Sequence, residues 1–105
     1  DLHLDFAALH WLPGALDYAR EHPSSPVHGR NHAYYRQFVD FAQPEAAEDP
    51  VLRGLLYDPQ TSGGLLMAVD PQRAETALAE LHKRGVDARR IGEVRAGTGR
   101  IVVHP

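Results

Sequence analysis

Residues 56–69 read Leu-Tyr-Asp-Pro-Gln-Thr-Ser-Gly-Gly-Leu-Leu-Met-Ala-Val, and they join a polar loop directly to an apolar run. Pro59 fixes its own φ and biases Asp58 towards extended geometry, while the glycine pair permits positive φ or the close approach of another backbone. The apolar residues Leu65–Val69 are typical of a short strand that runs into the core. This stretch therefore predicts a tight turn followed by a buried strand.

The segments before this turn alternate between strand and helix patterns. Asp1–Phe6 alternates polar and apolar residues, as a strand does. Pro13 and Gly14 open a helix over residues 15–20, because proline is tolerated in a first turn. The remaining expected elements are a loop at 22–30, a short helix at 33–37, a strand at 38–41 and, after an acidic stretch at 42–50, a helix at 50–56.

The segments after the turn predict a helix and two strands. Asp70 can cap a helix whose first turn contains Pro71 and whose end is marked by Gly85. Strands at 88–94 and 100–103 flank residues 96–99, which predicts a C-terminal β-hairpin. Together the segments predict an α/β fold, an α+β sandwich of one mixed β-sheet covered by helices, with residues 1–105 forming a single domain.

The composition excludes several classes of function. Eleven basic and fourteen acidic residues give a net charge of -3, which favours neither nucleic acid nor an anionic membrane as a partner. The chain has no cysteine, so it has no disulfide, thiolate zinc site or thiol nucleophile. No apolar run approaches the length of a membrane span of about 20 residues. We expect a cytoplasmic protein.

The candidate binding residues lie in the turn and in one other loop. A phosphate-binding loop places its glycines after a strand and before a helix, whereas here they precede a strand and no lysine follows. A structural turn is therefore favoured over a nucleotide cradle. The candidates for contact with a substrate are Thr61, Ser62, Gly63, Gly64 and Asn31, although Asn31 also fits a residue that anchors a loop.

No catalytic set and no metal site is predicted. Asp1, His3 and Asp5 would point to the same face of a strand, which is a spacing that can supply ligands. A metal site needs further ligands and supporting hydrogen bonds that the sequence does not indicate. We therefore expect these three residues to form the solvated face of a terminal strand, and no serine, histidine and carboxylate combination can be assigned.

Nine consecutive residues, 58–66, match a family signature. The run Asp-Pro-Gln-Thr-Ser-Gly-Gly-Leu-Leu resembles the signature in the C-terminal domain of the selenophosphate synthetases, also called selenide, water dikinases, which belong to the aminoimidazole ribonucleotide synthetase superfamily. Shorter matches at similar spacing extend the resemblance over nearly the whole chain: Leu12-Pro13-Gly14-Ala15, Arg30-Asn31, Ile91-Gly92-Glu93-Val94 and Gly99-Arg100-Ile101. One departure is Pro26-Val27-His28-Gly29, where the family usually has a Gly-Gly-Thr-like turn.

The resemblance implies that the chain is a partial C-terminal domain. The parent enzyme would use ATP, selenide, water and magnesium to make selenophosphate, AMP and orthophosphate. Its nucleophilic Cys or selenocysteine, the neighbouring Lys and the metal-binding aspartates would lie before Asp1. The fragment would bind no cofactor itself, would be inactive alone, and would form one wall of the cleft against the N-terminal ATP-binding domain of the same protein. The parent would be a homodimer.

Two alternatives remain open. The chain could belong to another ATP-dependent member of the superfamily, and a Cys or selenocysteine followed by Lys before Asp1 would favour selenium over other substrates. It could also be a stand-alone binding or regulatory module, which a start codon immediately before Asp1 would favour.

Overall fold

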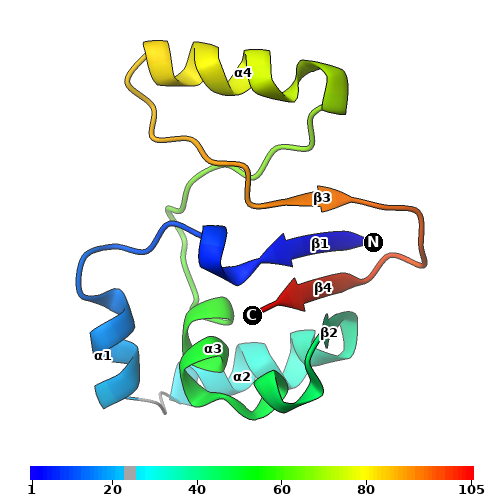
Figure 1. The fold of residues 1–105 in the computed structure, drawn as a ribbon. Coiled ribbons are helices and arrows are strands. Elements are labelled where there is room, and N and C mark those ends of the chain that lie inside the picture. The colour runs from blue at the N-terminus through cyan, green and yellow to red at the C-terminus, as the bar shows by residue number, and fades with distance from the viewer. Residues whose placement is uncertain (23–25) are drawn as a thin grey trace.

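A mixed four-stranded sheet organises the chain. The computed structural model describes residues 1–22 and 26–105. The strands are β1 (Leu2–Asp5), β2 (Val39–Phe41), β3 (Gly92–Val94) and β4 (Ile101–His104), in the spatial order β2-β4-β1-β3. β4 runs parallel to both β1 and β2, and β3 runs antiparallel to β1. One mixed sheet with helices confirms the predicted α/β class (Figure 1).

The expected C-terminal β-hairpin is wrong, because β1 lies between β3 and β4. Leu2 pairs with Val94 on one side and with Ile101 on the other. The connection between β3 and β4 therefore passes across the N-terminal end of β1. The Asp1 carboxylate holds this connection by accepting hydrogen bonds from the backbone N–H groups of residues 98–100 at 2.8–3.0 Å. A turn signal at 96–99 identified the reversal but not the strand inserted into it.

In the described part of the chain, four helices accompany the sheet: α1 (Ala15–Glu21), α2 (Pro26–Tyr35), α3 (Pro50–Leu56) and α4 (Pro71–Lys83). Short 3₁₀ segments cover Phe6–Ala8, Arg36–Phe38 and Pro44–Glu48. Asp49 and Asp70 cap α3 and α4 by accepting hydrogen bonds from backbone N–H groups in the first turn, and a proline follows each cap. Figure 1 shows α1, α2 and α3 together on the β2 and β4 side, whereas α4 lies beyond β3.

The core lies between the sheet and the first three helices. Val103, in the inner strand β4, is 1% exposed and is the most deeply buried large side chain among the described residues. Leu52 and Tyr57, at α3 and its C-terminal cap, are also buried. α1 and α2 both pack against α3. Burial of these side chains from water is the main force that holds α3 to the rest of the domain.

Two local predictions about the first helices need correction. The loop expected at 22–30 is in part helical, since α2 begins at Pro26, where the missing proline N–H has no helical partner in any case. Residues 23–25 lie outside the described residues. The helix expected at 33–37 is the end of α2 followed by the 3₁₀ turn Arg36–Phe38. The helices predicted at 15–20, 50–56 and after Asp70 are confirmed.

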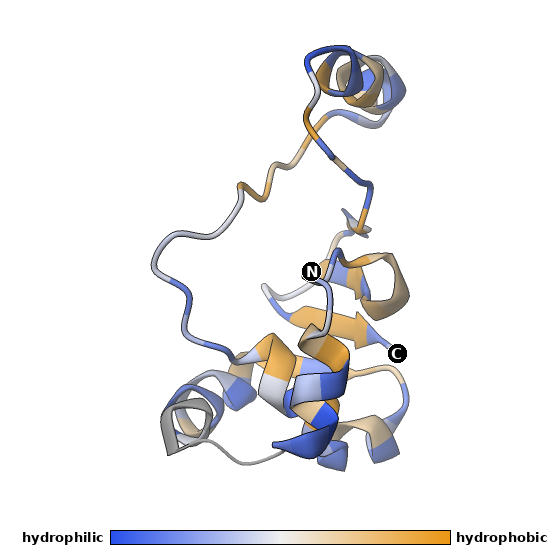
Figure 2. Ribbon diagram, turned by 90° about the vertical axis from the view of Figure 1, so that its left-hand side faces the viewer, coloured by the Kyte–Doolittle hydropathy of each residue, from blue (hydrophilic) through white to orange (hydrophobic). Residues whose placement is uncertain are grey.

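The strand expected at Leu65–Val69 is also wrong. These residues, which we call the apolar segment, form no regular structure, and Leu65 is 91% exposed. Figure 2 shows the connection from α3 to α4 running outside the sheet. A strand needs a partner edge for its backbone groups, and the apolar segment engages none among the described strands. The strand expected at 88–94 is shorter for a similar reason, since only Gly92–Val94 pairs with β1.

Candidate functional site

The candidate loop, residues 58–64, follows α3 directly and is exposed along its length. α3 ends at Leu56, and the next residue, Tyr57, is its C-terminal cap. Tyr57 is only 6% exposed, so one end of the loop is fixed in the core. Burial raises the pKa of the Tyr57 hydroxyl above its ordinary value, with a smaller opposing effect from Arg53. The loop thus projects from a buried base into solvent.

Asn31 anchors this base. Its side-chain Nδ2 donates a hydrogen bond of 2.9 Å to the backbone carbonyl oxygen of Tyr57. That oxygen belongs to a helix end, where carbonyls lack partners within the helix. Beside it, the His32 ring meets the Tyr57 ring edge-on at 5.0 Å. Desolvation, followed by the charges of Arg53 and Arg36, lowers the pKa of His32. α2 therefore holds the start of the loop through consecutive residues.

The loop itself has few internal contacts. Gln60 donates from Nε2 to the Asp58 carboxylate at 3.2 Å, which closes the first part of the turn. Thr61, Ser62, Gly63 and Gly64 make no hydrogen bond to any other residue within the described ranges 1–22 and 26–105. Their backbone N–H groups and the two hydroxyls face solvent and can bind a polar or anionic ligand.

The two glycines of the loop do not have the geometry that the sequence suggested. Neither Gly63 nor Gly64 has positive φ, and neither lies against another backbone. A Cβ at Gly63 would meet only Gln60 Oε1 at 3.6 Å, and one at Gly64 would meet nothing within 4 Å. Neither feature that the sequence permits at this pair, positive φ or close approach of another backbone, is therefore present in this conformation of the loop.

The structure brings Asn31 near the loop through Tyr57 but does not gather the five candidates in one cavity. Two open grooves lie elsewhere. One lies between the apolar segment and α4, and the other lies over β1, β3 and β4. Thr61–Gly64 line neither of them. Sequence reasoning missed Tyr57 as the anchor, although its position between a helix pattern and Asp58-Pro59 was a usable signal.

The aspartates and histidine at the N-terminus have structural partners. Asp5 Oδ1 accepts a hydrogen bond from the Ala7 N–H and so caps the first 3₁₀ turn, while Asp1 holds residues 98–100. His3 Nδ1 lies 3.0 Å from His104 Nε2, with the two rings stacked. Desolvation, then Arg95 and His104, lowers the pKa of His3. Within residues 1–22 and 26–105, no group of three or more His, Asp or Glu side chains is placed to hold a metal.

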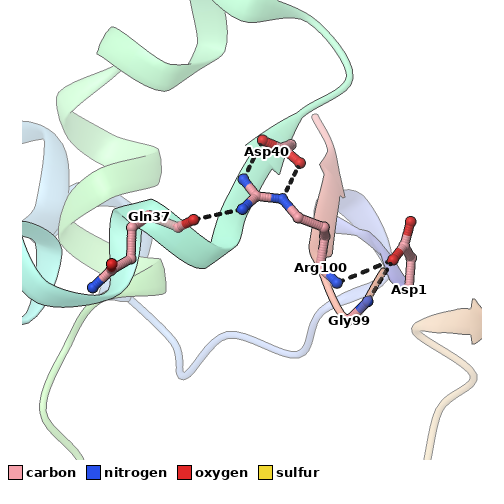
Figure 3. A network of polar contacts seen from close by, with 5 residues as sticks. All are labelled: Asp1, Gln37, Asp40, Gly99 and Arg100. Atoms are coloured by element: carbon pink, nitrogen blue, oxygen red, sulfur yellow. Dashed lines mark hydrogen bonds and ion pairs between the residues drawn. The ribbon is translucent and has the colours of Figure 1, made fainter. Parts of the chain in front are cut away.

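The Arg100 side chain forms a network of polar contacts at the edge of the sheet (Figure 3). Its guanidinium donates to both carboxylate oxygens of Asp40 at 2.5–2.6 Å and to the backbone carbonyl of Gln37 at 2.5 Å. The Arg100 hydrogen bonds lower the pKa of the Asp40 carboxyl, and Asp40 raises the pKa of Arg100. This bidentate pair joins β2 to the start of β4 and is a structural contact rather than a part of the candidate loop.

Residues 24–104 match the family described as AIR synthase related protein, C-terminal domain. The chain belongs to this family. The match begins near α2 and ends in β4, so it includes Asn31, Tyr57, the candidate loop and α4. The AIR synthase related domain thus contains every residue that the sequence nominated for binding.

Three curated relatives of this AIR synthase related domain share one name. The chain is 38% identical over 99 residues to the selenide, water dikinase of Burkholderia orbicola (strain MC0-3), which covers 93% of the chain and 27% of that protein. It is 38% identical over 94 residues to the selenide, water dikinase of Carboxydothermus hydrogenoformans, covering 88% and 26%. The corresponding protein of Pelobacter propionicus is 48% identical over 65 residues, covering 61% and 18%. The chain therefore spans about a quarter of the length of these relatives.

Over the described residues of this AIR synthase related domain, no helix has both the length and the apolar character that crossing a membrane requires.

Proposed function

We propose that this chain is the C-terminal domain of a selenide, water dikinase and that it contributes one wall of the active-site cleft. The observation that carries the proposal is its similarity, over 93% of its length, to proteins of that name. The signature at residues 58–66 lies on the exposed loop that follows α3. Within that signature, Thr61–Gly64 make no hydrogen bond to another described residue, so their place in a family signature is better explained by a ligand than by packing.

The geometry of the loop supports a binding role. Its base is held by the buried Tyr57 and by the hydrogen bond from Asn31, so the loop starts from a fixed point. Beyond it, Thr61–Gly64 offer backbone N–H donors and two hydroxyls that have no partner among the described residues. Such a set of donors suits phosphate oxygens or a phosphorylated product. We infer that Thr61–Gly64 face the cleft and contact the substrate there.

The reaction proposed for the whole protein converts ATP, selenide and water into selenophosphate, AMP and orthophosphate. Magnesium would neutralise the phosphates. The nucleophile and the metal-binding carboxylates would come from an N-terminal ATP-binding domain, and the present chain would close over that domain. We further propose a cytoplasmic, homodimeric parent. The role of this chain would thus be to position the substrates and to enclose the cleft, whereas residues of the N-terminal domain would form and break the bonds.

The test is selenide-dependent AMP formation by the full-length protein, measured with and without the candidate loop intact. Replacement of Thr61–Gly64 by four alanines should abolish AMP formation while the melting of the protein shows that it remains folded. Full activity of this variant would contradict the placement of the loop in the cleft. Absence of selenide dependence in the intact protein would contradict the proposed reaction itself.

A second candidate is an ATP-dependent enzyme of the same superfamily with a substrate other than selenide. The family description, AIR synthase related protein, does not specify selenide, and it therefore supports this second candidate as well. ATP turnover that continues without selenide and depends on another acceptor would support it. The residues encoded before Asp1 distinguish the two candidates independently, since a Cys or selenocysteine followed by Lys favours selenide as the substrate.

A further inference from the structure

The apolar segment Leu65–Val69 is exposed although its composition suits a buried strand. Its four large side chains are 43–91% exposed. None of its backbone groups forms a hydrogen bond with another described residue. An uninterrupted apolar run is typical of a strand covered on both faces, so in this position it leaves apolar surface in water and its backbone without protein partners.

The outer edge of β3 has unpaired backbone groups that could pair with the apolar segment. Among the described strands, β3 pairs with β1 alone. Backbone hydrogen bonds join Asp5 to Ile91 and Arg95 to Asp1, so by the alternation of antiparallel ladders the N–H and C=O groups of Gly92 and Val94 point away from β1. Val94 is 66% exposed. The outer edge of β3 therefore offers unpaired donors and acceptors to another strand.

α4 connects these two features, and its apolar residues are only partly covered. None of its residues is buried, and its apolar residues Ala74, Ala77, Leu78 and Leu81 recur at helical spacing. Asp70 caps α4 immediately after the apolar segment, and residues 84–91 lead from its end to β3. The order is therefore extended segment, helix and strand, with short connections between them.

We infer that the apolar segment closes onto the outer edge of β3 as a fifth strand, parallel to it, and that α4 then covers the adjoining face of the sheet. The structure described above is the open form. In the closed form the backbone groups of Gly92 and Val94 acquire partners, and the apolar faces of the segment and of α4 leave water together. The inference does not depend on the proposed activity.

Chain lengths favour closure within one molecule. A five-residue strand is about 16 Å long and a helix of the length of α4 is about 20 Å long, so the helix returns the chain to the starting end of a neighbouring parallel strand. Such strand, helix and strand units adopt a right-handed crossover almost without exception. The eight residues 84–91 are sufficient for the return, and the tether keeps the local concentration of the segment high.

Closure would act on the candidate loop. Thr61–Gly64 separate the anchored Tyr57 from the apolar segment, so docking of the segment would fix the second end of the loop as well. The loop then becomes a bridge between α3 and the edge of the sheet. Opening and closing would thus present the same four residues in two arrangements.

Hydrogen exchange of the backbone amides, followed by NMR on the 105-residue chain, tests the inference. Closure predicts that at least one amide among Leu66–Ala68, together with an amide of Gly92 or Val94, exchanges at least tenfold more slowly than in an unstructured peptide. The double substitution Leu66→Pro and Met67→Pro removes adjacent N–H groups that point to opposite sides of a strand, so it should abolish both protections. The amides of Leu2 and Asp5, bonded within the sheet, are the internal control for folding.

Two results would overturn the inference. Exchange at unprotected rates in the apolar segment, with Leu2 and Asp5 protected, would show that it stays open. Protection that rises with protein concentration, together with a doubled mass in solution, would show that the edge of β3 binds the segment of a second copy. Protection that is independent of concentration and sensitive to the two prolines supports closure within the chain.

Discussion

Asn31 Nδ2 donates a 2.9 Å hydrogen bond to the carbonyl oxygen of Tyr57, and this bond ties α2 to the end of α3 at the residue before the candidate loop. The bond is partly buried, and it spans 26 residues of sequence. It therefore couples the stability of the helical layer to the position at which the loop leaves the domain.

Replacing Asn31 by alanine should lower the free energy of unfolding by about 1–3 kcal/mol, since it leaves a partly buried carbonyl without its donor. Urea denaturation of the chain measures this. Gln37→Ala is the matched control, because Gln37 Nε2 donates a 2.8 Å hydrogen bond to the Tyr34 carbonyl at an exposed site. A similar decrease in the free energy of unfolding in the two variants would show that the Asn31 bond stabilises the chain no more than an exposed hydrogen bond does.

The pair formed by Asp40 and Arg100 should make stability depend on pH in the acidic range. The pKa of Asp40 is lowered by the Arg100 hydrogen bonds, so its contribution is present above the ordinary Asp pKa and is lost as the pH falls through the lowered value. A double-mutant cycle with Asp40→Asn and Arg100→Gln should show favourable coupling near neutral pH that disappears in strong acid. Coupling that is unchanged in acid would mean that charge plays no part in the contact.

Glycine is required at position 92 rather than in the candidate loop. A Cβ at Gly92 would overlap the backbone carbonyl of His3 in the neighbouring strand, whereas one at Gly64 meets nothing within 4 Å. Gly92→Ala should destabilise the chain by about 1–3 kcal/mol, as overpacked substitutions do. Gly64→Ala should be neutral or slightly stabilising in the open form. Thermal melts of the two variants compare them directly, and the reverse order would contradict this account.

Thr61→Val should reduce the activity of the full-length protein without changing the stability of this chain. The hydroxyl has no partner among the described residues, so its removal breaks no contact of the fold. The measurement is the rate of selenide-dependent AMP formation beside a melting curve. Thr98→Val, also at an exposed position, is the control, since only the backbone N–H of Thr98 serves the structure. Equal activity of the two variants would remove Thr61 from the proposed site.

The chain without the rest of its parent should produce no AMP from ATP, magnesium and selenide. The reason is chemical, since the sequence contains no cysteine and no assignable nucleophile with its base. Chromatography of the nucleotide products measures the outcome. AMP formation that persists after repurification, and that co-elutes with the chain, would contradict the proposal that the catalytic residues lie in the N-terminal domain.

Sequence patterns predicted those elements whose signals are local. The Asp-Pro pair at 70–71 located the beginning of α4 because capping depends only on neighbouring residues, and the structure shows that Asp49 caps α3 in the same way. The hairpin was predicted wrongly because β1, nearly 100 residues away, occupies the place between its two strands. Likewise the strand expected at Leu65–Val69 depends on a partner edge, which a local pattern does not specify.

The candidate site was predictable to a similar extent. The signature at residues 58–66 located an exposed loop, and the anchoring role considered for Asn31 corresponds to its hydrogen bond with Tyr57. The backbone geometry of Gly63 and Gly64 was not predictable, because a glycine permits positive φ without requiring it. Contact of these residues with a ligand stays a prediction.

The place of β1 between the two last strands has a consequence for the order of events during synthesis. β1 is synthesised before both of its partners, β3 and β4, which lie far later in the sequence, so the sheet cannot assemble until those two strands have emerged from the ribosome. Contacts of such large sequence separation slow folding, since a long loop must close before any pairing is gained. During that interval both edges of β1 lack a partner strand, and a chaperone that shields Leu2–Asp5 would have its effect then.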